Sequence, residues 1–165
     1  MAKIIRNRRL DDDTWRLLEA GPLLAPGEDG FVPEFPAGDI IVPLELWRLR
    51  GDELTARAGR LGLLLAAHDE PESIAPDLAR FSLVAVRFDK FADGRGYSLA
   101  RLLRERYRWH GELRAFGDVG RDQLLFLERA GFDGFELRPG ADARAALAAF
   151  GELPDAHPAF RRRAA

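Results

Sequence analysis

The sequence contains no cysteine. This absence excludes disulfides, a thiolate nucleophile, and iron–sulfur or zinc sites that are held by cysteine. Long apolar runs are missing too. No segment approaches the roughly 18 apolar residues of a membrane-spanning helix, and residues 1–6 hold no apolar stretch of signal-peptide length. We therefore expect a cytosolic protein that does not cross a membrane.

Lysine is scarce, because only Lys3 and Lys90 accompany a large number of arginines. The formal net charge of −2 is too balanced for a general nucleic-acid-binding protein. The three histidines are far apart in sequence and lack the spacing of metal ligands. We expect neither a nucleic-acid partner nor a metal site.

Motifs that bind redox cofactors are also absent. Residues 94–99 lack the third glycine of the dinucleotide-binding fingerprint, and no phosphate-binding loop that ends in Gly-Lys-Ser/Thr occurs. The turn after the first predicted strand, at residues 43–46, has no run of hydroxyl side chains that would bind a flavin phosphate. The sequence therefore predicts a protein without a redox cofactor.

The length of 165 residues and the 47% of apolar residues fit one main globular domain. Residues 1–20 alternate around Asp11-Asp12-Asp13, which predicts an N-terminal hairpin with an acidic, solvated turn. Residues 21–38 contain four glycines and four prolines, so we expect a long loop that is neither helix nor central strand. Residues 154–165 are predicted to form a mobile tail.

Residues 39–153 show strands and helices in alternation. The predicted strands are 39–42, 61–67, 83–86, 112–116 and 133–137, and the predicted helices are 44–58, 99–109, 121–130 and 142–150. This order predicts an α/β domain of about five mostly parallel strands with right-handed crossovers. A three-layer, doubly wound sheet is the first choice. The alternative is a half (β/α) barrel whose edge a dimer or the hairpin would close, since the sequence does not show whether helices cover one face or both.

Polar side chains follow the ends of the predicted strands. They include Asp89, Asp93, Arg95, Asp118, Gln123 and Arg138. Parallel strands bring such residues to one edge, where the glycines beside Arg95 and free backbone amides would suit a small oxyanion such as sulfite or phosphate. The alternative is that Asp93 and Asp118 only brace their loops by accepting hydrogen bonds from backbone amides.

The helix predicted from Leu99 to Trp109 has two distinct faces. Ser98 is placed to cap its start, and the helical spacing turns Leu99, Leu102 and Leu103 toward the sheet. On another face, Arg101, Arg104 and Arg108 form a stripe. This stripe is either a solvated surface or a docking surface for an acidic partner, because the planar fork of arginine pairs well with carboxylates.

Several short segments of the sequence resemble those of one bacterial family. They are the runs 91–98, 102–107, 111–115, 117–119, 121–123 and 131–133. Together they resemble the family catalogued as domain of unknown function 934. Its members are generally encoded beside an assimilatory sulfite reductase and are often labelled probable oxidoreductases of sulfite reduction. The resemblance implies a role in reducing sulfite to sulfide for cysteine synthesis, and it supplies no catalytic residues.

These observations together give two hypotheses. In the first, the chain is an accessory protein that docks the reductase, its electron donor, or both, through the arginine stripe and the loops around Arg95 and Asp118. In the second, it is a small-anion binder or an enzyme of the same pathway. The candidate binding residues are Asp93, Arg95, Tyr97, Arg101, Arg104, Arg108, Asp118, Asp122 and Gln123. A homodimer is compatible with both hypotheses.

Overall fold

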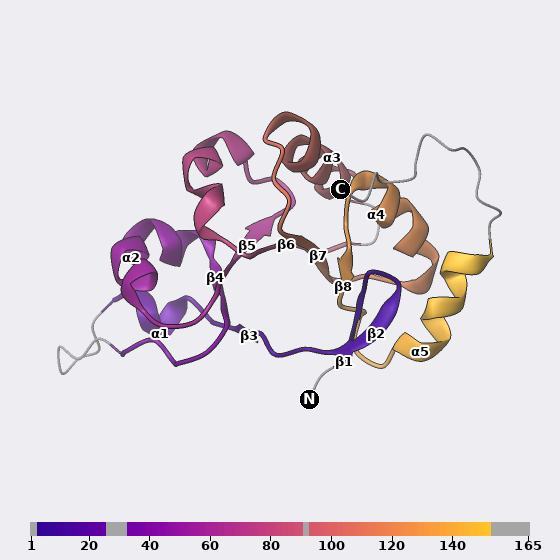
Figure 1. The fold of residues 1–165 in the computed structure, drawn as a ribbon, viewed down its shortest axis with the longest axis horizontal. Helices are drawn as coiled ribbons and strands as arrows, with labels where there is room; N and C mark the ends of the chain where they lie inside the picture. The colour runs from indigo at the N-terminus through magenta and orange to yellow at the C-terminus, as the bar shows by residue number, and fades with distance from the viewer. Residues whose placement is uncertain (1–2, 26–32, 91–92, 153–165) are drawn as a thin grey trace.

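The structure is a computed structural model that describes residues 3–25, 33–90 and 93–152. One mixed sheet of 8 strands, in the order β2-β1-β8-β7-β6-β5-β4-β3, organises it (Figure 1). The strands are β1 Lys3–Arg6, β2 Arg9–Asp12, β3 Arg16–Leu17, β4 Ile40–Pro43, β5 Leu61–Ala66, β6 Leu83–Phe88, β7 Glu112–Gly117 and β8 Gly134–Phe135. Strands β3 to β8 run parallel, while β1 runs antiparallel to β2 and β8. The α/β class and the parallel strands are confirmed.

Helices and helical turns connect these strands. The α-helices are α1 Gly21–Leu24, α2 Leu44–Ala56, α3 Arg95–Arg101, α4 Leu124–Ala130 and α5 Ala143–Ala146. The other helical turns are η1 Pro71–Ser73, η2 Ala75–Arg80, the π-helical turn η3 Leu102–Arg106, η4 Arg121–Gln123 and η5 Leu147–Gly151. Helix α4 ends at Gly131, because a φ of 124° suits glycine there.

The sheet is a half-barrel. From β4 to β8, strands that follow one another in sequence are also neighbours in the sheet. Right-handed crossovers between such neighbours place every connecting helix on the same face, and α2, α3 and α4 lie on the outer side of the curved sheet (Figure 1). Of the two arrangements that the sequence leaves open, the half-barrel is therefore the one observed. A doubly wound, three-layer sheet would need the strand order to reverse.

The N-terminal hairpin is present, but its turn is not where we predicted it. Residues Asn7 and Arg8 make the turn, with φ of 50° and 59°, as a tight two-residue hairpin connection requires. The acidic run instead continues the second strand: Asp11 pairs with Arg6, and Asp12 pairs with Lys3. Strand β1 adds to the edge of β8, so the hairpin covers that edge, as the half-barrel alternative anticipated.

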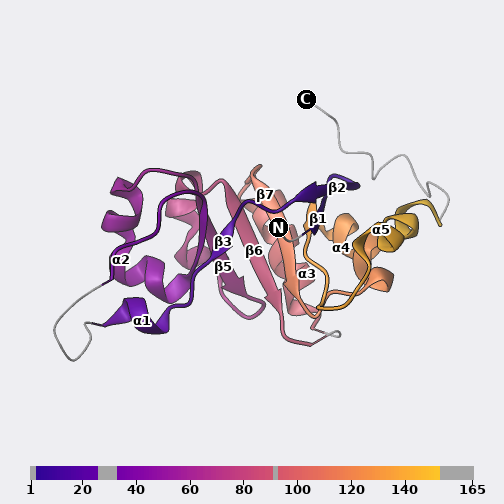
Figure 2. The ribbon, with the colours of Figure 1, turned by 90° about the horizontal axis from the view of Figure 1, so that it is seen from below.

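Residues 13–15 connect β2 to β3 and cross in front of the concave face of the sheet (Figure 2). We call this segment the strap. After it, β3 pairs with β4 at the opposite edge of the sheet. The chain thus spans the open side of its own half-barrel, and the residues up to 20 are not a hairpin alone.

Three further local predictions were wrong. A short helix, α1, forms in the loop predicted for residues 21–38, because proline is tolerated in a first helical turn. Helix α3 begins at Arg95, so Ser98 lies inside it and does not cap it. Leu102 is exposed and does not face the sheet. Residues 26–32 of the predicted loop and the predicted tail at 154–165 lie outside the described residues.

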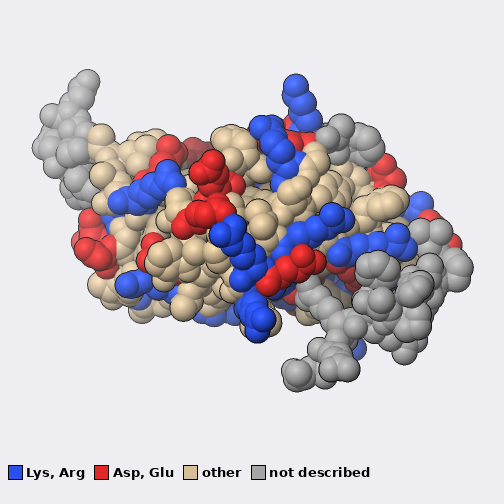
Figure 3. Space-filling view, turned by 90° about the horizontal axis from the view of Figure 1, so that it is seen from above, with Lys and Arg blue, Asp and Glu red and all other residues tan. Residues whose placement is uncertain are grey.

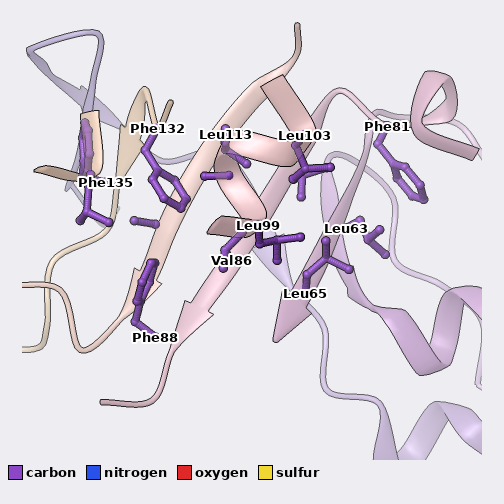
Figure 4. Close-up of a cluster of buried hydrophobic side chains, with 14 of the residues drawn as sticks. Leu63, Leu65, Phe81, Val86, Phe88, Leu99, Leu103, Leu113, Phe132 and Phe135 are labelled. Carbon is purple, nitrogen blue, oxygen red and sulfur yellow. The ribbon is translucent and has the colours of Figure 1, made fainter. Parts of the chain in front are cut away.

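The main core lies between the outer face of the sheet and the helices (Figure 4). Val86 and Phe88 of β6 pack there with Leu99 and Leu103 of the helical segment that follows, and Phe88 meets Phe132 edge to face at 5.8 Å. Each such apolar side chain contributes about 1.5–3 kcal/mol when it is fully buried. This core fixes the strands, and therefore also the side chains on their concave face.

Candidate functional site

The first predicted loop holds a closed ion pair. Asp93 accepts from Nε and Nη2 of Arg95, both at 2.9 Å, and also from the backbone N–H of Arg95 at 3.2 Å. The bonds from Arg95 hold the pKa of Asp93 below its ordinary value. Of the two roles considered for Asp93, the geometry favours the bracing role, because its carboxylate accepts the backbone N–H of Arg95 at the start of α3. An oxyanion at Arg95 would have to displace Asp93.

The second predicted loop is packed against neighbouring elements. Gln123 is buried and accepts from the backbone N–H of Gly120 at 2.8 Å, and its side chain also bonds to Tyr97. Burial raises the pKa of Tyr97, and the hydrogen bond to Gln123 acts in the opposite direction without cancelling that rise. Asp118 lies 3.4 Å from Nη1 of Arg138. Tyr97, Gln123, Asp118 and Arg138 thus lie around one loop, whereas Asp122 and Asp89 are exposed.

The predicted arginine stripe is not continuous. Arg104 donates to the carbonyl oxygens of Gly131, Trp109 and Gly111 at 2.8–3.0 Å and pairs with Asp133 at 3.1 Å. It therefore ties the end of the helical segment to α4 and to the start of β7. Only Arg101 and Arg108 of the stripe are exposed.

A broad polar groove of about 510 Å³ lies between α2 and the η1–η2 segment. Arg48 donates to Ser73 Oγ across it at 3.0 Å. Its exposed lining residues include the charged Arg48, Asp52, Glu53 and Arg80, so it resembles open surface more than a built site.

The concave face of the sheet holds a more enclosed cavity of about 200 Å³. Its apolar walls come from the strands and the strap, and its polar groups come from the strap, β7 and the residue that follows β8. The lining residues are Asp13, Trp15, Leu17, Ile41, Leu64, Ala85, Arg114, Phe116 and Glu136. Trp15 packs over the sheet next to Gly62, where any side chain would meet the Trp15 ring at 3.3 Å. The strap therefore forms one wall of the cavity.

Arg114 is the most buried charged side chain at this site, with 1% of its surface exposed. Its Nε donates to Glu112 Oε1 at 3.0 Å, and its Nη1 donates to Asp13 Oδ2 at 2.9 Å. Its Nη2 lies 2.9 Å from the same Glu112 oxygen, but outside hydrogen-bonding geometry, so this buried nitrogen has no hydrogen-bond partner among the described residues.

Glu136 supplies the second polar group of the cavity. Burial raises the pKa of its carboxyl group, while the positive charge of Arg114 acts in the opposite direction. Within the described part of the chain, its side chain makes no hydrogen bond or ion pair. A cavity with apolar walls and a few convergent polar groups, one of them with a perturbed pKa, is the usual form of a small-molecule site.

The sequence analysis missed this site. Residues 112–116 were correctly predicted to form a strand, but Arg114 was not among the candidate site residues. One signal was available: the neighbouring strands, at 61–66 and 83–86, are apolar on both faces, so both faces of the sheet are covered. A charged side chain on a covered face needs buried partners, and nothing local identifies the strap as their source.

The part of the chain that the structure describes holds neither a group of metal ligands nor a membrane-spanning helix. Over residues 3–25, 33–90 and 93–152, no three His, Asp or Glu side chains are grouped so that they could hold a metal ion. In the same part of the chain, none of the helices has the length and apolar character that crossing a bilayer requires.

Comparison with known proteins gives one result. No curated protein and no solved structure matches the chain. A family model described as "Bacterial protein of unknown function (DUF934)" matches residues 62–162, which include β6, β7, β8, α3 and α4. The strap, with Asp13 and Trp15, lies outside the matched segment. Because the match covers more than half of the sequence, this chain belongs to the bacterial DUF934 family.

Proposed function

We propose that the protein is a cytosolic accessory of assimilatory sulfite reduction, which docks the reductase or its electron donor. The pathway comes from the genomic neighbourhood that family membership implies. The mode of action, contact with another protein, is suggested by the surface of the helical layer.

The observation that carries the docking proposal is the exposed surface of two adjacent helices. Leu102, which follows α3, is 36% exposed, and Phe126 of α4 is 57% exposed. Arg129 lies over the Phe126 ring at 6.0 Å. Arg101 and Arg108 are exposed and make no side-chain contact with charged groups of the described residues. We call Arg101, Leu102, Arg108, Phe126 and Arg129 the helical surface.

Aromatic side chains and arginines are enriched in protein interfaces, and unpaired arginines can meet the carboxylates of a partner without first breaking an internal ion pair. Over the face seen in Figure 3, acidic and basic side chains interleave. A partner would therefore be selected by local pairing with individual arginines rather than by a broad positive field.

Copurification with the cognate sulfite reductase tests the docking proposal. We expect Arg101→Glu/Arg108→Glu to abolish copurification, because both arginines would present the wrong charge to an acidic partner. The matched control is Arg16→Glu/Arg144→Glu, which reverses two exposed arginines elsewhere, on β3 and α5. Equal retention of the reductase by both double variants would refute the role of this surface.

Growth of a deletion strain tests the pathway separately. The strain should fail to grow with sulfate or sulfite as sulfur source and should grow with sulfide. Normal growth on sulfate would refute the pathway assignment, even if the protein copurified with a redox enzyme.

A further inference from the structure

We propose that the concave cavity of the half-barrel binds a small planar aromatic molecule that carries a hydrogen-bond donor next to an acceptor, as in an aromatic amide or a heteroaromatic lactam. The site is defined by the strap, Arg114 and Glu136. This inference does not depend on the proposed role in sulfite reduction, since it concerns a different face of the molecule.

The shape of the cavity limits the ligand. Its volume of about 200 Å³ equals the space of roughly seven water molecules at about 30 Å³ each. Trp15 and Phe116 contribute aromatic walls, and Leu64 and Ala85 contribute the floor from β5 and β6. A cavity of this size accepts a single ring with one substituent and excludes a complete dinucleotide.

The polar groups determine what the substituent must be. Arg114 lines the cavity, and its positive charge favours an acceptor atom there, such as a carbonyl oxygen, while Asp13 and Glu112 hold the guanidinium in place. The Glu136 carboxyl group lacks a partner among the described residues and calls for a donor. An amide or lactam carries a carbonyl oxygen and an N–H side by side, and thus satisfies both groups at once.

The charges disfavour an anionic ligand. Asp13 and Glu112 contact Arg114 directly, and Glu136 lines the same cavity, so carboxyl groups surround the single buried guanidinium. Three further arginines lie near the cavity. Glu112 and Asp11 engage Arg6, Asp39 pairs with Arg60 beside the Trp15 ring, and Arg87 lies over the Phe116 ring at 5.4 Å. The carboxylates of Asp13, Glu112 and Glu136 would repel sulfite or phosphate. An uncharged amide adds no charge to this group of ion pairs.

Nuclear magnetic resonance of the tryptophan indole N–H groups provides the test. The chain has three tryptophans. Trp47 and Trp109 donate from Nε1 to Asp77 and to the Leu78 carbonyl oxygen, away from the cavity, so they serve as internal controls. Benzamide should shift the Trp15 signal saturably, with a Kd in the millimolar range that befits so small a ligand, and should leave the other two signals unchanged.

Matched probes and variants separate the parts of the proposal. Benzoate has the same shape but lacks the donor and carries a negative charge, so it should bind at least about tenfold more weakly than benzamide. Glu136→Leu should weaken the binding of benzamide about 10- to 100-fold, as loss of a hydrogen bond to a charged group does. Toluene, which has the ring but no polar group, should bind the variant as it binds the wild type. The control Glu105→Leu changes an exposed carboxylate outside the cavity and should leave benzamide binding unchanged.

Three results would overturn the inference. One is the absence of any Trp15 shift in the wild-type protein, which needs no variant to fold. Another is equal affinity for benzoate and benzamide. The third is full benzamide affinity in a Glu136→Leu protein that has a wild-type circular dichroism spectrum.

Discussion

Replacing Arg114 by methionine removes a guanidinium that both the strap and the sheet hold inside the concave face. In the wild type, Arg114 bonds Asp13 at 2.9 Å and Glu112 at 3.0 Å, and these side chains are 1%, 10% and 16% exposed. Removing one partner of a buried ion pair costs about 3–5 kcal/mol, because the remaining charge keeps its desolvation penalty.

The structure places the expected cost at the lower end of that range. Glu112 keeps Nε of Arg6 as a partner at 2.9 Å, so it is not left without a positive charge. Among the described residues, Asp13 keeps only the backbone N–H of Trp15 as a donor, at 3.2 Å. We therefore expect Arg114→Met to lower the free energy of unfolding by about 3 kcal/mol, mainly through Asp13.

A double-mutant cycle locates this cost. Asp13→Asn in the Arg114→Met background should restore about 1–2 kcal/mol, since it removes the unpaired charge. Urea unfolding followed by tryptophan fluorescence and by circular dichroism measures all four proteins. The control is Arg95→Met, which breaks an ion pair of similar geometry that is 66% exposed on the arginine side and should leave stability almost unchanged. A loss below about 1 kcal/mol for Arg114→Met, or strictly additive effects in the cycle, would refute the reasoning.

Three other predictions concern single positions. Gly117→Ala should destabilise the protein by about 1–3 kcal/mol in a urea titration, because φ is 99° and the new Cβ would lie 2.5 Å from the Phe88 carbonyl oxygen. The control is Gly94→Ala, which should be neutral or slightly stabilising, because Gly94 has a helical φ and open space around it. Burial raises the pKa of Glu136 above its ordinary 4.5, so the folded protein holds this proton more tightly and loses stability as the pH rises from 4.5 through the raised pKa. The Tm of Glu136→Gln minus the Tm of the wild type should therefore increase as the pH rises over this window. A difference that does not change with pH would contradict the raised pKa of Glu136. Arg104→Met should lower stability by about 2–4 kcal/mol, because it removes the hydrogen bonds to three partly buried carbonyl oxygens and the ion pair with Asp133. Limited proteolysis should then cut first near residues 107–111, and cleavage elsewhere would contradict the role of Arg104 in holding this segment.

Much of the fold could be predicted from the residues themselves. The apolar runs at 61–66 and 83–86 form strands because they can be buried on both faces, and Gly131 ends α4 because its backbone adopts a positive φ. Helix α2 is interrupted at Arg50, which precedes Gly51 and Asp52, two residues with low helix propensity. These features depend on neighbours within one element, so local sequence is sufficient to predict them.

The roles of individual polar residues were harder to predict. Arg104 and Arg101 look equivalent in the sequence, but Arg104 lies beside Gly131, where its side chain meets three carbonyl oxygens and Asp133. Asp93 and Arg95 were expected near a ligand, and they pair with each other because they are two residues apart at the start of a helix. Which charges remain available to a partner is thus decided by packing.

By itself, the sequence determined the α/β class, the order of strands and helices, and membership of the family, since each of these follows from patterns that are contiguous in the chain. Only the tertiary structure decided that the sheet is a half-barrel and that the strap crosses its concave face. The ion pair between Asp13 and Arg114 joins residues 101 positions apart. No local pattern encodes such a contact, because it depends on the strand order that brings both edges of the sheet within reach of one short segment.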